Sequence, residues 1–347
     1  TLAQQAATLL NCSPAFYNAP MLELAQLIAS HSGLHQVWFG SSGAEVNEGA
    51  IKLARRWGQK YRSGAFEIIT LQNSFHGRTL ATMAASGKPQ WDPLFEPKVP
   101  GFTRVPINDI DAVAAAITEK TVAVMLEPIL GEGGVIPASR EFLQQLRALT
   151  HQHNLLLIFD EVQTGMGRTG TLFAFEQSGI APDILTLGKG LGGGVPLSAL
   201  VAHRDFCVFE HGDQGGTFSG SALMTAVGCA VFNEVAQPAF LEAVRNNGKY
   251  LREQLLIIAH EFQLGEVRGK GLLAALAIPA GNSGGNPTGD AEAIANAAFA
   301  RGLLVNAPRA NTLRFMPALN VTRAEIDLMA ELLRLALVDT AAAICAA

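Results

Sequence analysis

The sequence predicts an α/β protein built on a mostly parallel β-sheet, with helices on both faces and a smaller α+β domain at the C-terminal end. Apolar runs of strand length alternate with longer stretches of helical period up to about residue 235, and the pattern changes after it. The chain has 347 residues, of which 49% are hydrophobic and 16% charged, so it can bury a large core in two domains.

The first part of the chain carries the strands of the predicted sheet. They are expected at Val37–Gly40, Phe66–Leu71, Val122–Glu127, Leu155–Asp160, Ile184–Leu187 and Ser198–Ala202. Apolar residues spaced three and four apart predict amphipathic helices over 43–62 and 140–153, which would serve as crossovers between strands.

The second part predicts a long helix, a strand over Glu266–Ile278, a Gly/Asn/Pro loop over 281–289, a helix, two short strands and a closing helix. We therefore expect an N-terminal helical segment over 1–30, a large domain over 31–235 and a small domain over 236–347. The chain starts at Thr1 inside a helical pattern, which suggests that a leading segment is missing.

Charge and cysteine content narrow the class of partner. A net charge of −5 without a cluster of basic residues disfavours nucleic acid and favours small molecules. The sequence shows no membrane span or signal peptide. Cys12, Cys207, Cys229 and Cys345 lie far apart, and we interpret them as buried free thiols of a cytoplasmic protein.

Ligands of open α/β sheets bind beyond the carboxyl ends of the strands, and unusual residues follow three of the predicted strands. After the first comes "GSSGAEVNEGAIKLA", a strand-to-helix turn of small residues whose backbone amides and helix N-terminus suit a phosphate. A simple N-cap at Ser41 or Ser42 explains this stretch about as well.

Asp160 ends the buried strand before "EVQTGMGRTG", where a lone carboxylate is costly and needs a cationic partner. A helix-capping or turn aspartate is the simpler alternative. No histidine or carboxylate cluster with ligand spacing accompanies Asp160, so we expect no metal.

Lys189 follows the next strand directly, in "LTLGKGLGGG". In an apolar pocket the pKa of a lysine falls, and its amine can form a Schiff base with a carbonyl. Gly190 stands where a Walker A motif needs Ser or Thr, which disfavours a nucleotide-binding loop. A structural lysine that extends to the surface is the alternative.

A phosphate cradle, a strand-end aspartate and a Schiff-base lysine are the three parts that pyridoxal 5'-phosphate requires. The stretches "SSGAEVNEGAIKLAR", "FHGRTLATM", "EPILGEGGVIPAS", "LLIFDEVQTGMGRTG", "LTLGKGLGGGVP" and "LRFMPALNV" also occur in the order found in class III aminotransferases. Over essentially its whole length the chain resembles the ornithine/acetylornithine type of that family. The resemblance implies the fold type I of pyridoxal-phosphate transferases, and it implies that the family's opening segment is absent here.

The resemblance also implies cofactor roles. Lys189 would hold the cofactor and move the substrate proton, and Asp160 would keep the ring nitrogen protonated. The remaining cofactor-binding residues implied are Ser42, Gly43 and Ala44 for the phosphate, Phe75 and Val162 for the ring faces, Gln163 for the ring hydroxyl, and Thr217 for the phosphate of a neighbouring subunit. Thr217 therefore implies a homodimer with shared active sites. Core packing would explain Phe75 and Val162 equally well.

Substrate roles follow in the same way. Arg314 resembles the residue that binds the α-carboxylate of glutamate or 2-oxoglutarate, and Arg78 one that binds a more distant carboxylate, because guanidinium groups bind carboxylates in bidentate fashion. Glu132 resembles a switch that pairs with Arg314 when a terminal amine is the donor, and Tyr17 an aromatic residue at the entrance. A surface ion pair is the alternative for Arg78, Glu132 and Arg314.

The implied reaction moves the terminal amino group of N-acetylornithine, or of a related ω-amine, to 2-oxoglutarate in arginine biosynthesis. N-succinylornithine, ornithine and 4-aminobutyrate stay open as donors, as does a catalytically silent homologue of the fold. A nicotinamide-dependent dehydrogenase is disfavoured, because the glycines of "GLGGG" precede a strand instead of opening a helix.

Two departures from the family pattern bear on these roles. Leu130 stands where the family usually has glutamine, and "TFSGSALM" replaces "TYGGNPLA". The second change removes a proline at the head of a helix, which we expect Ser221 to cap instead.

Overall fold

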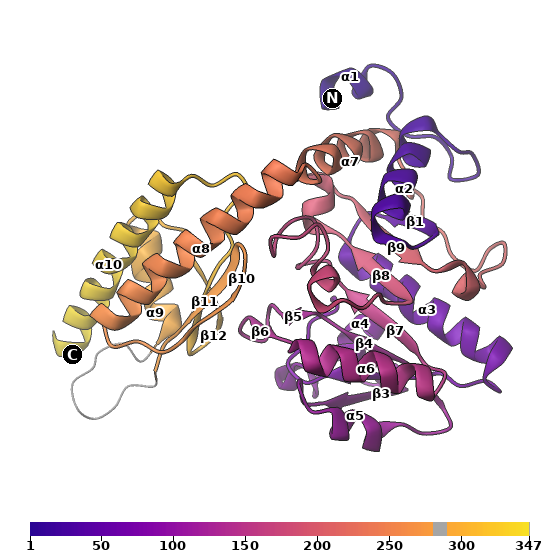
Figure 1. The fold of residues 1–347 in the computed structure, drawn as a ribbon, viewed down its shortest axis with the longest axis horizontal. Helices are drawn as coiled ribbons and strands as arrows, with labels where there is room; N and C mark the ends of the chain where they lie inside the picture. Colours follow the sequence, from indigo (N-terminus) through magenta and orange to yellow (C-terminus); the bar gives the residue numbers. More distant parts are fainter. Residues whose placement is uncertain (280–289, 347) are drawn as a thin grey trace. The chain divides into compact units, whose positions relative to one another are not determined.

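The chain forms two compact units in the computed structural model, which describes residues 1–279 and 290–346 (Figure 1). Unit 1 comprises Thr1–Pro128, Ala138–Met166 and Thr171–Gln237, and unit 2 comprises Ile129–Pro137, Gly167–Gly170 and Pro238–Ala347. Two short stretches of unit 2 thus interrupt the sequence of unit 1. The loop predicted over 281–289 lies outside the described residues.

Unit 1 is built on a sheet with the strand order β1-β9-β8-β7-β4-β2-β3. Its strands are β1 (Gln36–Gly40), β2 (Glu67–Leu71), β3 (Phe102–Val105), β4 (Thr121–Leu126), β7 (Leu156–Asp160), β8 (Ile184–Leu187) and β9 (Ser198–Ala202). The pairs β2–β3, β2–β4, β4–β7 and β7–β8 are parallel, whereas β9 is antiparallel to both β1 and β8. The mostly parallel sheet is confirmed, and the carboxyl ends of β1, β2, β4, β7 and β8 lie at one edge of it.

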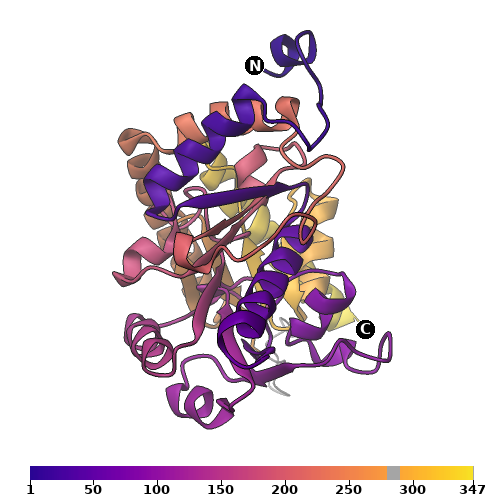
Figure 2. The ribbon, with the colours of Figure 1, turned by 90° about the vertical axis from the view of Figure 1, so that its right-hand side faces the viewer.

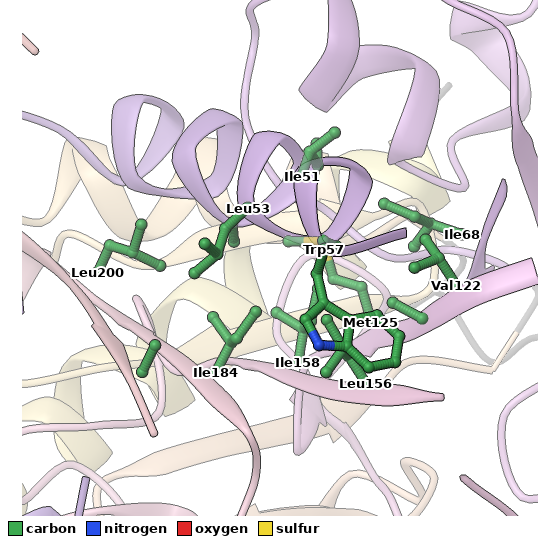
Figure 3. Packing of buried hydrophobic residues seen from close by; sticks show 14 of the residues in the cluster. Ile51, Leu53, Trp57, Ile68, Val122, Met125, Leu156, Ile158, Ile184 and Leu200 are labelled. Carbon is green, nitrogen blue, oxygen red and sulfur yellow. The ribbon is translucent and has the colours of Figure 1, made fainter. Parts of the chain in front are cut away.

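Helices cover both faces of this sheet. The helices of unit 1 are α1 (Leu2–Ala6), α2 (Ala19–Ser32), α3 (Gly43–Tyr61), α4 (Leu80–Ala85), α5 (Ile110–Ala116), α6 (Arg140–Gln152) and α7 (Ala222–Val235). Figures 1 and 2 place α5 and α6 on one side of the strands and α3 on the other. Side chains of α3 such as Ile51, Leu53 and Trp57 pack on the strands in one apolar cluster with Ile158 and Ile184 (Figure 3). This burial fixes α3, and with it the turn that precedes it.

The structure places each of the strands predicted in the first part within one residue of its expected bounds, and it adds β3. The N-terminal segment differs from its continuous helical pattern, because residues 7–18 are turns and irregular structure between α1 and α2. Asn18 ends this stretch as the N-cap of α2 and accepts a hydrogen bond from the amide of Met21.

Unit 2 holds an antiparallel sheet of order β10-β11-β13-β12 with helices packed on it. The elements are β5 (Ile129–Leu130), β6 (Ile136–Pro137), α8 (Pro238–Glu261), β10 (Val267–Lys270), β11 (Leu273–Ala277), α9 (Ala291–Ala300), β12 (Asn306–Arg309), β13 (Thr312–Phe315) and α10 (Arg323–Ala346). The single strand predicted over Glu266–Ile278 is wrong. It is a hairpin, since Gly271 turns the chain with φ of 55°.

Candidate functional site

A cavity of about 220 Å³ lies in unit 1 and is lined by residues that follow the carboxyl ends of the strands. Its lining residues are Gly43, Ala44, Asn47, Phe75, His76, Gly77, Arg78, Glu127, Asp160, Val162, Gln163 and Lys189. The parallel strands explain this convergence, because their carboxyl ends meet at one edge. Eight of the residues that sequence reasoning selected are thus brought together: Gly43, Ala44, Phe75, Arg78, Asp160, Val162, Gln163 and Lys189.

Asp160 is a buried charged group of this cavity, with 3% of its surface exposed. Its Oδ2 accepts hydrogen bonds from Asn47 Nδ2 at 2.7 Å and from His76 Nδ1 at 2.8 Å, and its Oδ1 accepts one from the Val162 amide at 3.1 Å. The close side-chain partners of the carboxylate are thus an amide and a histidine, and the histidine is charged only if protonated. Because the carboxylate accepts from Nδ1, that nitrogen carries a proton.

The position of the Thr186 hydroxyl determines whether Oδ1 of Asp160 can accept a further hydrogen bond. Its hydroxyl lies 2.7 Å from Asn47 Oδ1 and 3.4 Å from Asp160 Oδ1, and its single proton is best used on the nearer oxygen. Among the described residues, the Val162 amide is then the one close donor to Oδ1 of Asp160. A carboxylate oxygen has two lone pairs, so Oδ1 can accept a further N–H.

The turn after β1 has the serine N-cap that was one of its two interpretations, and phosphate binding stays a prediction. Ser42 is the N-cap of α3 in a capping box with Glu45, and the Glu45 carboxylate accepts the amides of Ser41 and Ser42. The amides of Gly43 and Ala44 are in the first turn of the helix and have no intrahelical acceptor. A Cβ on Gly43 would meet Val162 Cγ1 at 2.7 Å, so the absence of a side chain lets this turn approach Val162.

Phe75 is held at the cavity by a hydrogen bond of its backbone amide and by contacts of its ring. Its amide donates to Glu127 Oε1 at 2.8 Å, and its ring lies 5.7 Å from the ring of Trp91. The Lys88 ammonium lies 4.8 Å from the centre of the Phe75 ring, at cation–π distance.

Lys189 follows β8 at the start of a short 3-10 turn, Lys189–Gly192, with φ of 42°. A non-glycine residue with positive φ is uncommon and stores backbone strain, which is frequent at functional sites. Of the two environments that the sequence left open for Lys189, an apolar pocket and the surface, the structure gives it an exposed position. The reason is its place beyond the end of the strand, at the cavity wall instead of in the core.

Arg78 lines the cavity and is exposed, and the structure gives it no ion-pair partner among residues 1–279 and 290–346. Gln163, which lines the same cavity, is 8% exposed and so is far more buried than Arg78. Arg78 therefore does not fit the surface ion pair that was its alternative.

In unit 2, the predicted pair of Arg314 and Glu132 is formed. Arg314 Nη1 lies 2.7 Å from Glu132 Oε1, and the side chains are 11% and 25% exposed. The same guanidinium donates to the Gly131 carbonyl at 3.0 Å and to Asn306 Oδ1 at 2.8 Å. Leu130 is fully buried in β5 beside this pair.

Three predicted site residues, Ser42, Tyr17 and Thr217, lie in unit 1 but do not line its cavity. Tyr17 is 82% exposed, and Thr217 is exposed and accepts a hydrogen bond from Asn11 through its carbonyl oxygen. The prediction that Ser221 caps α7 is wrong: its hydroxyl donates to the Leu10 carbonyl at 2.8 Å and makes no cap.

Sequence reasoning missed Asn47, His76 and Glu127. Asn47 lies four residues after Gly43 on the same face of α3, and His76 lies between Phe75 and Arg78, so both had a positional signal. Glu127 directly follows β4 as Asp160 ends β7, which is the same strand-end pattern.

Other features bear on the class of protein. Burial raises the pKa of Cys207 to about 11 and that of Cys229 to about 12, as for thiols that are not nucleophilic. No helix of the described part of the chain has the length and apolar character needed to cross a membrane. Within the same residues, no group of three or more His, Cys, Asp or Glu side chains is placed to hold a metal ion.

The chain belongs to the class-III aminotransferases: the sequence profile of this family matches residues 1–337. It is an enzyme of the fold type I architecture, and members of this class use pyridoxal 5'-phosphate.

Similar proteins have closely related names. The chain is 58% identical to acetylornithine aminotransferase of Ralstonia nicotianae, over 96% of this chain and 83% of that protein. It is 56% identical to acetylornithine aminotransferase 2 of Bordetella pertussis, over 95% and 82% of the two chains. Among solved structures, N-acetylornithine aminotransferase of Stenotrophomonas maltophilia matches with a TM-score of 0.83 and 36% identity, over 99% of this chain and 85% of that one.

A more distant structure, ornithine aminotransferase of Toxoplasma gondii, superimposes with a TM-score of 0.90 at 29% identity, over 97% of this chain and 81% of that one. A second structure of that Toxoplasma enzyme has pyridoxal phosphate at partial occupancy in its active site. The resemblance seen in the six sequence stretches is thus confirmed at the level of the family.

Proposed function

We propose that this chain transfers the terminal amino group of N-acetylornithine, or of a related ω-amine, to 2-oxoglutarate, as a cytoplasmic homodimer in arginine biosynthesis. The observation that carries the proposal is the ion pair between Arg314 and Glu132, at 2.7 Å. It gives the chain a carboxylate-binding arginine whose charge is neutralised when no substrate carboxylate is present. The names of the relatives from Ralstonia and Bordetella support the same donor.

The residues of the unit 1 cavity fit pyridoxal phosphate. Oδ1 of Asp160 can accept the N–H of a protonated ring nitrogen, and Ser42, Gly43 and Ala44 offer the start of α3 to the phosphate. Phe75 and Val162 would contact the two ring faces, and Gln163 the ring hydroxyl. When bound, the cofactor supplies a carbonyl that captures the amino group and a ring that accepts electrons from the substrate carbon.

The protein's own residues then perform the proton chemistry. The Lys189 amine would take the proton from the substrate carbon as a general base and give it back as a general acid. Its exposed position at the cavity wall leaves the amine accessible to substrate. Asp160 is held in one orientation by Asn47, His76 and the Val162 amide, so it needs no rearrangement during the reaction.

Substrate carboxylates are bound by the two arginines. Arg78 binds the carboxylate distant from the reacting amine, and Arg314 binds the α-carboxylate of glutamate or 2-oxoglutarate after Glu132 releases it. Tyr17 would line the substrate entrance, and Thr217 would help to hold the phosphate of the partner subunit's cofactor, which requires the homodimer.

The test is to reduce the purified, cofactor-loaded protein with borohydride and to map the labelled peptide. We expect a single pyridoxyl group on Lys189, and a label on Lys88 or another lysine would contradict the assignment. A panel of amine donors with 2-oxoglutarate, comprising N-acetylornithine, N-succinylornithine, ornithine and 4-aminobutyrate, then ranks the substrates by kcat/KM. A labelled Lys189 without turnover of any donor would identify a silent homologue.

A further inference from the structure

A second cavity, of about 250 Å³, lies within unit 2 and shares no residue with the proposed catalytic machinery. Basic side chains dominate its wall. They come from α8, which contributes Arg245, Lys249 and Arg252, and from the hairpin after it, which contributes Arg268 and Lys270. No acidic side chain lines this cavity in the described part of the chain.

The spacing of the basic residues on α8 places them on one face of the helix. Arg245, Lys249 and Arg252 lie at positions i, i+4 and i+7, where side chains are neighbours and like charges repel. Two acids lie beside the cavity: Glu266 pairs with Arg268 at 3.0 Å, and Glu253 approaches Lys249 at 4.0 Å. Five cations against two acids, on a chain of net charge −5, make this cavity a local concentration of positive charge.

The guanidinium groups are oriented by backbone carbonyls. Arg245 Nη1 donates to Gly170 at 2.8 Å, Arg252 Nη1 donates to Val267 at 2.5 Å, and Arg268 Nε donates to Gly134 at 2.7 Å. A guanidinium has five N–H donors, so the single bonds of Arg245 and Arg252 fix these groups and leave further donors for a ligand. Arg268 also donates to Glu266 Oε1 and Thr312 Oγ1, so it contributes mainly its charge.

Glycines bring the two walls close together. A Cβ on Gly248 of α8 would meet the Gly271 carbonyl oxygen at 2.5 Å, so the helix and the hairpin turn approach through backbone alone. Gly269 and Gly271 have φ of 118° and 55°, which other residues rarely adopt. The sequence thus builds the shape of the cavity as well as its charge.

We infer that this cavity binds a small anion carrying two phosphate groups, separately from the phosphate of the cofactor. Planar guanidinium groups bind phosphate oxygens in bidentate fashion, and the lysine ammonium groups add point charges. A volume of about 250 Å³ is below the range of pockets for drug-sized ligands, about 300–1,000 Å³. The site therefore suits an anion of the size of a diphosphate.

The experiment is calorimetric titration of the full chain, loaded with pyridoxal phosphate, with inorganic pyrophosphate at low ionic strength. We expect one site per chain, and we expect Lys249→Gln/Arg252→Gln to weaken it by about tenfold or more. The matched control, Lys120→Gln/Arg140→Gln, removes the same charges from exposed positions of unit 1 and should leave the affinity unchanged.

A parallel titration with citrate tests the chemistry of the ligand. We expect citrate to bind at least about tenfold more weakly than pyrophosphate, because phosphate oxygens match the guanidinium groups and add charge. No binding of pyrophosphate, an equal loss in the control variant, or equal affinity for citrate would each overturn the inference. None of these measurements depends on transaminase activity, so the outcome is independent of the proposed function.

Discussion

The carboxylates of unit 1 and unit 2 differ in how firmly the fold holds them. Asp160 is 3% exposed and accepts hydrogen bonds from Asn47, His76 and a backbone amide. The Glu132 side chain is 25% exposed and pairs with the long side chain of Arg314. A group held by several buried donors is pre-organised for one task. A partly exposed ion pair is weak enough to exchange partners. The first arrangement suits an unchanging cofactor and the second a changing substrate.

The largest effect on turnover is expected from substitution of Asp160, the more buried of the two carboxylates. Asp160→Asn removes the charge that would face the ring nitrogen, and we expect kcat to fall by about 10³-fold or more for every donor, with the cofactor still partly bound. Steady-state kinetics with an ω-amine and with glutamate measure this. The exposed Asp205→Asn should have no effect, and near-normal turnover of Asp160→Asn would exclude the proposed role.

Glu161, next to Asp160, is a buried carboxyl group with no proposed catalytic role, so it shows what burial alone does to the pH dependence of stability. Burial raises its pKa to about 8, although the amides of Ala174 and Phe175 donate to it and lower the pKa. The unfolded chain loses this proton near pH 4.5 and the folded chain near pH 8, so stability is complete below about pH 4.5 and falls as the pH rises to 8.

The expected loss over that window is up to about 5 kcal/mol. Urea unfolding at several pH values measures it. Glu161→Gln carries no titrating proton and should remove this part of the pH dependence, while the exposed Glu119→Gln should retain it. A wild-type stability that does not fall between pH 5 and 8 would contradict the raised pKa.

Glu132→Ala tests the second carboxylate, which we propose exchanges its partner Arg314 with a substrate carboxylate. Without Glu132, Arg314 keeps its charge unpaired when an ω-amine is bound, but glutamate no longer has to displace a carboxylate. We expect kcat/KM to fall for the ω-amine and to stay equal or rise for glutamate, a differential of about 10–100-fold. Single-turnover reaction of the bound cofactor with each donor measures it directly. An equal loss for both donors would mean that Glu132 supports the fold alone.

His76 is expected to act through Asp160 as a positioning residue. His76→Ala leaves Oδ2 with Asn47 as its remaining side-chain donor, and we expect kcat to fall by about tenfold and the visible spectrum of the bound cofactor to change its pH dependence. His76→Asn, which retains an N–H donor, should recover part of the loss. A change in stability with an unaltered spectrum would indicate a purely structural role.

The smallest effect is expected at the backbone of the cavity. A Cβ at Gly43 would meet Val162 at 2.7 Å, and one at Gly188 would meet it at 3.2 Å. We expect Gly43→Ala to weaken cofactor binding by about tenfold and Gly188→Ala by less, because the smaller overlap can be relieved by a slight shift of Val162. Equilibrium dialysis of the cofactor compares the two, and the reverse order would show that Val162 does not limit the approach.

Sequence reasoning performed well where the signal was local. The strand over Ile184–Leu187 and the start of α3 at Gly43 follow from apolar periodicity and from an N-cap serine, which depend on neighbouring residues alone. The hairpin at Gly271 was missed although Gly269, Lys270 and Gly271 interrupt the apolar pattern, because the apolar run over 272–278 was extended back across this turn signal. The Ser221 cap failed because a tertiary acceptor, the Leu10 carbonyl, took its hydroxyl.

The sequence by itself determined which residue types this protein places after its strands: the aspartate, the lysine, the glycines and the arginines. Strand periodicity and residue chemistry are properties of short segments, so they can be read without a fold. The tertiary structure alone decided that Asn47, His76 and Thr186 surround Asp160, and that Arg245 and Arg268 face one cavity. These groups come from segments far apart in the chain, and only strand order and helix packing bring them within hydrogen-bonding distance or around one cavity.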